Sequence, residues 1–185
     1  MKGMIFTEFM EMVEETQGLE VLDQIIQRAH LSTQGSYTAV GNYDYNELVR
    51  LVVELSKLSK VSVPELLHAF GRHVFGRIFV KSYGSFFENA RSAFMFLEGI
   101  ETYIHIEVRK LYPDAQLPRF NCRRQGNNRL IMEYSSVRPF ADFAHGLIIG
   151  CIDHYKEDIE VIKEDTSNGQ GTAARFTLTM KGNGG

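Results

Sequence analysis

The 185-residue chain is 44% hydrophobic, with 20 basic and 23 acidic side chains and a formal net charge of −3. A chain of this length and composition can bury one sizeable core, so we expect a single domain over residues 1–185. The near balance of charge, without a dense basic run, argues against nucleic-acid binding through the phosphate backbone.

The chain has two cysteines, Cys122 and Cys151, and neither has the spacing of a zinc ligand. We interpret both as reduced, half-buried thiols. No apolar run approaches the ~20 residues needed to span a bilayer, and the first residues lack an apolar signal segment. The sequence therefore predicts a soluble, cytoplasmic protein without membrane contact, and we expect a monomer.

Apolar residues recur at helical spacing from Met4 to about Tyr112. The clearest runs are Ile5, Phe9, Met12 and Val13, then Leu22, Ile25, Ile26 and Ala29, then Leu48, Leu51, Val52 and Leu55. These runs predict successive amphipathic helices, with a helical front over about 1–62 and a remainder over about 63–185.

A further helix should begin at Ser62-Val63-Pro64-Glu65. Ser62 is the expected N-cap, and Glu65, three residues later, is its reciprocal partner. Proline fits the first turn because the N–H that it lacks would have no helical acceptor there. Gly71 interrupts this helix at a cost of ~1 kcal/mol relative to alanine, which predicts either close packing or bending.

The helix predicted over residues 100–111 carries His105. Ile104, Val108 and Leu111 define its buried stripe, with His105 at the edge, so that the ring can enter an interior pocket. A lone helical histidine is more often a packed or solvated side chain, and the chain has five other histidines. Segments 83–89 and 91–96, before this helix, are short and aromatic.

After Pro118 the sequence changes from helical spacing to alternating or β-branched and aromatic runs, at residues 120–123, 129–135, 159–164 and 175–180. Gly126-Asn127-Asn128 is a good hairpin turn, and Pro139 should begin a helix over 140–155. We therefore expect an α+β fold, in which a mostly helical N-terminal part packs on a C-terminal antiparallel sheet of about four strands with a long helix.

Tyr134, Ser136 and Arg138 alternate along an extended segment, so their side chains should share one face. They present two hydroxyl donors and a guanidinium fork, a set that suits a pair of carboxylates. The two propionates of a heme are carboxylates of this kind, and burying an unpaired guanidinium would be costly.

Over nearly its whole length, the chain resembles a bacterial heme nitric oxide/oxygen-binding domain, or H-NOX domain. The resemblance is carried by Met1-Lys2-Gly3, Ala69-Phe70-Gly71, Ile104-His105-Ile106-Glu107-Val108, Leu117-Pro118, the Tyr-x-Ser-x-Arg motif at 134–138 and Gly146-Leu147-Ile148-Ile149-Gly150. Tyr-x-Ser-x-Arg alone often occurs by chance, but the set in this order and at these distances is specific.

The resemblance implies a heme b buried between the helical front and the sheet, with His105 as the axial ligand of its iron. It also implies roles for the residues around the porphyrin. Tyr134, Ser136 and Arg138 would bind the propionates, Pro118 would press on a pyrrole ring and distort it, Ile5 and Leu147 would pack against the heme, and Gly71 would act as a hinge.

The distal pocket should decide which gas is bound. Oxygen-binding relatives carry a tyrosine nine residues after the first tyrosine of the motif, supported by polar residues on the first and middle helices. Here those positions hold Phe143, Phe9 and Val74, and we expect Ile78 to line the same pocket. Dioxygen needs a hydrogen-bond donor for its partial negative charge, whereas nitric oxide on ferrous iron needs none.

The sequence therefore favours a heme-based sensor, without enzymatic activity, that binds nitric oxide and also carbon monoxide. The resemblance implies that nitric oxide weakens the iron–His105 bond, that the strain imposed by Pro118 and Ile5 then relaxes, and that the helical front rotates. A separately encoded histidine kinase or cyclic-di-GMP enzyme would detect this change.

Three alternatives stay open at this stage. The first is an oxygen-binding sensor of the same family, with His73 or a trapped water as the distal donor. The second is a small heme enzyme, a peroxidase or nitric oxide dioxygenase, which would need distal acid and base groups. The third is a domain on the same scaffold that has lost its heme.

Overall fold

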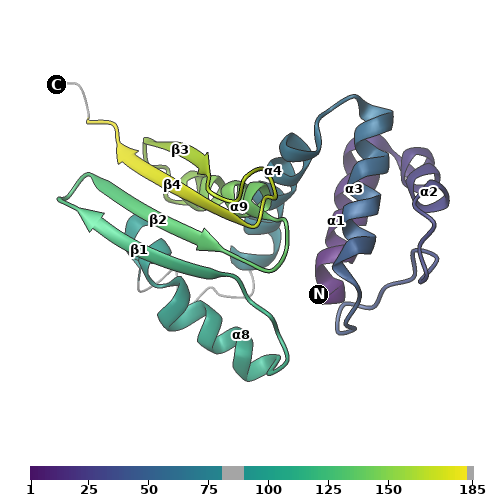
Figure 1. The fold of residues 1–185 in the computed structure, drawn as a ribbon, viewed down its shortest axis with the longest axis horizontal. Coiled ribbons are helices and arrows are strands. Elements are labelled where there is room, and N and C mark those ends of the chain that lie inside the picture. The colour runs from purple at the N-terminus through teal and green to yellow at the C-terminus, as the bar shows by residue number, and fades with distance from the viewer. Residues whose placement is uncertain (81–89, 183–185) are drawn as a thin grey trace. The chain divides into compact units, whose positions relative to one another are not determined.

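The computed structural model describes residues 1–80 and 90–182, and Figure 1 shows its ribbon. The chain divides into two compact units, Met1–Phe70 and Gly71–Gly185. The boundary falls inside one helix, α4 (Val63–Val74). Within the two described ranges, no helix combines the length and the hydropathy needed to cross a bilayer.

The first unit is helical, as its apolar spacing predicts. It contains α1 (Gly3–Gln17), α2 (Leu19–Arg28), α3 (Tyr45–Ser59) and the beginning of α4. Gly18 separates α1 from α2 with a φ of +89°, a conformation that only glycine adopts at little cost. Phe9, Ile25 and Leu51, from three of the predicted stripes, are fully buried and belong to the core.

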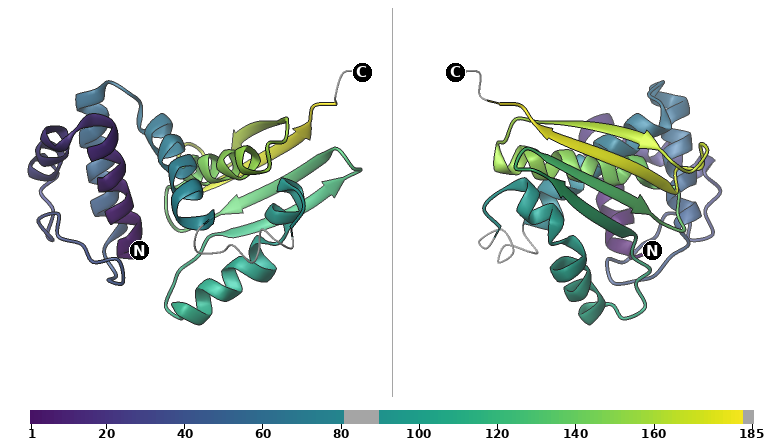
Figure 2. Two further views of the ribbon diagram at one scale, coloured as in Figure 1. Left: turned by 180° about the vertical axis from the view of Figure 1, so that it is seen from behind. Right: turned by 60° about the vertical axis from the view of Figure 1, so that its left-hand side comes forward.

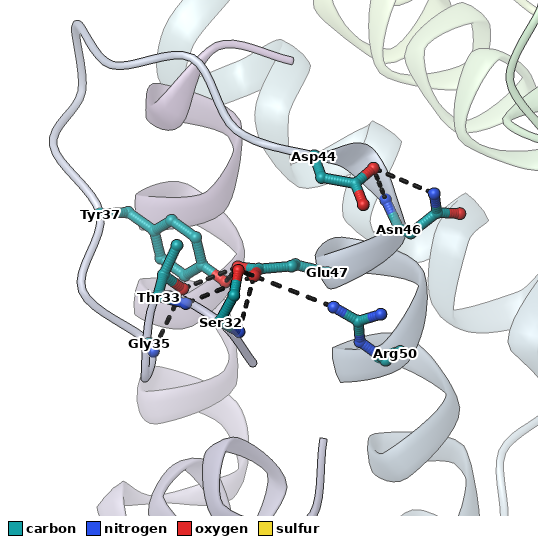
Figure 3. Close-up of polar contacts among 8 residues, drawn as sticks. All are labelled: Ser32, Thr33, Gly35, Tyr37, Asp44, Asn46, Glu47 and Arg50. Atoms are coloured by element: carbon teal, nitrogen blue, oxygen red, sulfur yellow. Dashed lines mark hydrogen bonds and ion pairs between the residues drawn. The ribbon is translucent and has the colours of Figure 1, made fainter. Parts of the chain in front are cut away.

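A buried carboxylate in this unit fixes the connection between α2 and α3 (Figure 3). Glu47 is 1% exposed and accepts hydrogen bonds from the backbone N–H of Ser32 (2.9 Å) and the hydroxyls of Ser32, Thr33 (2.7 Å) and Tyr37 (2.7 Å). Burial alone would raise the pKa of Glu47, but these hydrogen bonds outweigh it and hold that pKa at about 2. The charged carboxylate thereby organises a connection that has few apolar side chains of its own.

The start of α4 confirms the predicted capping box. The backbone N–H of Ser62 donates to Oε2 of Glu65 (3.1 Å), and the N–H of Glu65 donates to Oγ of Ser62 (3.4 Å). Asp44 caps α3 in a related way, since its carboxylate accepts from the backbone N–H of Asn46 (3.0 Å).

In the second unit, α4 continues into a π-helical turn, η1 (Phe75–Phe79), and the described chain resumes before α7 (Ala93–Glu98). The predicted aromatic segment at 83–89 lies outside the described residues. The single helix predicted over 100–111 is instead a π-helical turn, η2 (Ile100–Ile104), followed by α8 (His105–Leu111). Leu111 is 66% exposed rather than part of the buried stripe, because α8 ends at this residue.

The sheet confirms the predicted strands and the antiparallel arrangement. It consists of β1 (Arg119–Gln125), β2 (Arg129–Ser135), β3 (Ile159–Asp165) and β4 (Ala173–Met180), in the order β1-β2-β4-β3. The predicted hairpin turn joins β1 to β2 through Gly126, whose φ is +63°. The α+β prediction is therefore correct.

One face of the sheet is covered by helices, and α9 (Ala141–Tyr155) runs along it (Figures 1 and 2). Met132, Phe176 and Ile148 are buried in the common core of sheet and helices. Cys151 is fully buried in this core, so the expectation that it is half-buried is wrong; it lies on the inner side of α9.

Candidate functional site

His105 is the first residue of α8 and is 6% exposed. Its Nδ1 lies 3.1 Å from Oε1 of Glu101, four residues earlier. A carboxylate only accepts hydrogen bonds, so Nδ1 carries the proton and Nε2 keeps the lone pair. Burial lowers the pKa of His105 below its usual value, although Glu101 opposes part of this effect. The ring is therefore neutral near pH 7.

This arrangement fits the axial ligand of a heme. Iron needs a neutral imidazole with one available nitrogen, and the other ring N–H of a ligating histidine usually donates to a carboxylate or carbonyl. The sequence interpretation singled out His105 but missed Glu101. The spacing of four residues along one helix was the signal that could have identified it.

Aromatic rings connect His105 to the sheet. The ring of Phe120, in β1, lies 6.2 Å from that of His105 and 5.4 Å from that of Tyr134, in β2, between ring centroids. Phe120 and Tyr134 are also direct partners in the β1–β2 register. Pro118 is half-buried and immediately precedes β1. The histidine, the proline and the tyrosine of the motif thus come from consecutive elements of the second unit.

The Tyr-x-Ser-x-Arg residues lie together, although the segment is less regular than expected. Strand β2 ends at Ser135, and the chain bends over 137–139. The backbone N–H of Arg138 donates to Oγ of Ser136 (3.1 Å). Burial raises the pKa of Tyr134, which keeps its phenol protonated as a donor.

The guanidinium of Arg138 has two oxygen acceptors on one residue. It donates to the backbone oxygen of Gln116 (3.2 Å) and to its side-chain Oε1 (3.3 Å). The two oxygens of a carboxylate can accept the same pair of hydrogen bonds from one guanidinium. The residues present therefore fit a propionate. Gln116 was also missed by the sequence interpretation, because it lies in an irregular segment without a motif.

The residues predicted for the distal side and for packing come from other elements. Val74, at the end of α4, is fully buried, and Ile78, in η1, is half-buried. Phe143 and Leu147 lie on α9 and are also half-buried. At Gly71 the backbone of α4 meets that of α9, because an added Cβ atom would lie 2.9 Å from the nitrogen of Leu147.

Two predicted residues belong to the first unit. Ile5 and Phe9 are one helical turn apart on α1, where Ile5 is half-buried. Phe9 is fully buried, and its ring makes an edge contact with that of Phe70 at 5.2 Å between centroids. Their roles toward a heme stay predictions.

A hollow of about 390 Å³ in the second unit does not involve the predicted residues. Its lining includes Phe75 of η1 and His154 of α9, and the ion pair between Arg72 and Asp153 (2.5 Å) lies at the same place.

Comparison with known proteins points to the same chemistry. The model of the haem-NO-binding family, HNOB, matches residues 2–163. The Fe(II) unliganded H-NOX protein from K. algicida has 37% sequence identity and a TM-score of 0.93, with 99% of this chain and 98% of that chain covered.

Two further H-NOX structures are similar in fold. The IWP-051-bound H-NOX from Shewanella woodyi in the Fe(II)CO state has 39% identity and a TM-score of 0.83, covering 100% of this chain and 97% of that chain. The S. oneidensis protein in the Fe(II)NO state has 23% identity and a TM-score of 0.88, covering 98% and 99%. Because the family model spans most of the sequence and two of these structures exceed 30% identity over the whole chain, this chain belongs to the haem-NO-binding family, the heme-based gas sensors called H-NOX proteins.

Proposed function

We propose that this protein is a nitric oxide sensor that binds heme b through His105 and signals to a separate partner protein. The observation that carries the proposal is the state of His105: the ring is buried, its Nδ1 is held by Glu101, and Nε2 is the nitrogen left for iron.

The bound heme would supply an iron atom with one open axial position for a diatomic gas. The protein would hold it at several points. His105 would bind the iron, while Tyr134, Ser136 and Arg138 would donate hydrogen bonds to the propionates. By the family resemblance, Pro118 would press on a pyrrole ring and distort the porphyrin, and Ile5 and Leu147 would pack against the heme.

Gas choice follows from the chemistry of the proposed distal residues. Phe9, Val74, Ile78 and Phe143 carry no N–H or O–H on their side chains. Dioxygen requires such a donor, because it draws electron density from the iron and becomes partly negative. Nitric oxide and carbon monoxide do not require a donor. We therefore propose that the protein binds these two gases and forms no stable complex with dioxygen.

The signal would begin at the iron–histidine bond. By the family resemblance, nitric oxide would weaken this bond, and the strain imposed by Pro118 and Ile5 would then relax. Gly71 would then allow α4 to adjust as a hinge. We propose that the protein has no enzymatic activity and acts in the cytoplasm as a monomer. Its change of conformation would regulate a histidine kinase or a cyclic-di-GMP enzyme, the receivers that the family resemblance supports.

Replacement of the proposed ligand tests this function. In His105→Gly, the iron–histidine vibration of the ferrous protein should disappear, and added imidazole should restore heme binding. His73→Ala is the matched control and should keep the wild-type spectrum. If His105→Gly keeps the wild-type spectrum, or if His73→Ala abolishes it instead, His105 is not the ligand and the proposal is wrong.

A further inference from the structure

One oxygen atom of Glu101 joins two parts of the second unit. Oε1 accepts from Nδ1 of His105 (3.1 Å) and from the backbone N–H of Phe120 (2.8 Å), the second residue of β1. The Glu101 side chain is 33% exposed and that of His105 is 8% exposed. The shared oxygen therefore joins a buried histidine to a carboxylate side chain that is partly exposed.

The backbone around Glu101 is also unusual. Glu101 lies in the π-helical turn η2, and the backbone N–H of His105 donates to the carbonyl of Ile100, five residues earlier. A π-helical turn adds one residue within a helix and occurs frequently at functional sites. Here it directly precedes the histidine that the family resemblance assigns to iron.

These contacts restrict the histidine in two ways. The hydrogen bond from Nδ1 selects the tautomer in which Nε2 is the ligand, and it limits rotation of the ring. An anionic acceptor also increases the electron density on the imidazole, which strengthens its bond to a metal. Because the same oxygen is held by the backbone of Phe120, the carboxylate cannot turn away without losing its contact with β1.

We propose that Glu101 is the positioning residue for His105: it sets the tautomer of the ring and the strength of the iron–histidine bond, and thereby how easily nitric oxide breaks that bond. The inference rests on the proposed function. Glu101 also connects His105 to the sheet, because Phe120 pairs with Tyr134 in the β1–β2 register. A release of His105 would change a hydrogen bond of β1 directly beside a proposed propionate anchor.

The test compares two replacements with a matched control. Glu101→Gln keeps an oxygen acceptor without the charge, and Glu101→Met removes the acceptor at similar size. Glu107→Gln is the control, because Glu107 lies in the same helical segment but pairs with Lys110 (2.6 Å) on its exposed side. The readout is the iron–histidine stretching frequency of the ferrous protein, measured by resonance Raman spectroscopy.

The frequency should fall from wild type to Glu101→Gln and further in Glu101→Met, whereas Glu107→Gln should equal wild type. Heme loss should accelerate by roughly 10-fold to 100-fold in Glu101→Met, the range found when a partner of a metal ligand is removed. In the heme-free protein, ¹⁵N chemical shifts of His105 should report the Nδ1–H tautomer in wild type and a shift toward the Nε2–H tautomer in Glu101→Met.

The outcomes separate this inference from the proposed function. A wild-type protein that binds no heme through His105 contradicts the proposed function. A wild-type protein that does so, with equal frequencies and tautomers in all variants, contradicts the role of Glu101 alone. If Glu101→Met does not fold, the comparison of Glu101→Gln with Glu107→Gln still decides.

Discussion

The carbonyl oxygen of Phe143 occupies the space that a Cβ atom on Gly71 would need. The nitrogen of Leu147 and the Cα atom of Gly146 are also close to this position, at 2.9 Å and 3.0 Å. All three are backbone atoms of α9, so they cannot move as the end of a side chain can. Gly71 is therefore required for the close approach of two helices, whether or not it also acts as a hinge.

The first prediction is that Gly71→Ala destabilises the protein, because the new methyl group has to push α4 and α9 apart. Overpacking of this kind costs about 1–3 kcal/mol in the free energy of unfolding, measurable by urea denaturation. Gly76→Ala is the control, since a Cβ atom there meets nothing within 4 Å. That change should be neutral or stabilising by up to about 1 kcal/mol. Equal stability of the two variants would contradict the packing role.

The second prediction concerns Glu47 in the first unit. Glu47→Gln should lower the free energy of unfolding at pH 7 by about 1–3 kcal/mol, because the amide N–H₂ group opposes donors from Ser32, Thr33 and Tyr37. The pKa of Glu47 is about 2 in the folded protein, below its usual value. The stability that its charge contributes is thus present above about pH 4.5 and is lost as the pH falls toward 2.

Urea denaturation of wild type and Glu47→Gln across this pH range provides the test. The difference between the two proteins should be constant from pH 7 to about 5 and should shrink as the pH falls toward 2. A difference that is independent of pH would show that the hydrogen bonds do not depend on the charge of Glu47.

The third prediction is that Arg138→Ala weakens heme retention. Charge-assisted hydrogen bonds contribute about 1.5–3 kcal/mol each, so heme loss should be faster by roughly 10-fold to 100-fold. Transfer of heme to an excess of apomyoglobin measures this rate. Arg175→Ala removes a guanidinium from an ion pair with Glu133 (2.7 Å) on the exposed side of the sheet and should have no effect. Unchanged heme loss in Arg138→Ala would remove the propionate role.

The extent to which these features were predictable depends on whether they are local in sequence. The capping box of Ser62 and Glu65 joins residues three apart, and the strands follow from alternation, so both were predicted correctly. The contact of Glu101 with Phe120 joins residues 19 apart, and that of Arg138 with Gln116 joins residues 22 apart. Such pairs depend on how strands and helices pack, and no local pattern indicates them.

The helix before His105 shows a second limit of the sequence. Apolar spacing predicts one continuous helix over 100–111, but it cannot distinguish an α-helical turn from the wider π-helical turn of η2.

The buried carboxylate of Glu47 is a third feature that the sequence does not predict. A glutamate in the first turn of α3 would be expected to be exposed to solvent. Only the folded connection between α2 and α3 provides the hydrogen-bond donors that bury its carboxylate.

The fourth prediction is that Phe143→Tyr gives the ferrous protein detectable oxygen binding. The new phenol would stand where oxygen-binding relatives carry theirs, and one hydrogen bond to a partly charged acceptor contributes about 1.5–3 kcal/mol, roughly 10-fold to 100-fold in affinity. Phe9 and Val74 offer no polar group to orient it, so the complex should be short-lived unless Val74→Asn is added. Stopped-flow absorption measures its lifetime. Phe140→Tyr, on the neighbouring aromatic residue, should leave oxygen binding unchanged.

The absorption spectrum of the ferrous wild-type protein, recorded alone and then with nitric oxide, carbon monoxide and air, tests the central claim most directly. The account predicts that nitric oxide and carbon monoxide each shift the heme absorption band, and that air produces no stable oxygenated spectrum. A protein that takes up no heme, or a stable oxygenated spectrum at ambient oxygen, would contradict a nitric oxide sensor whose distal side chains lack a donor.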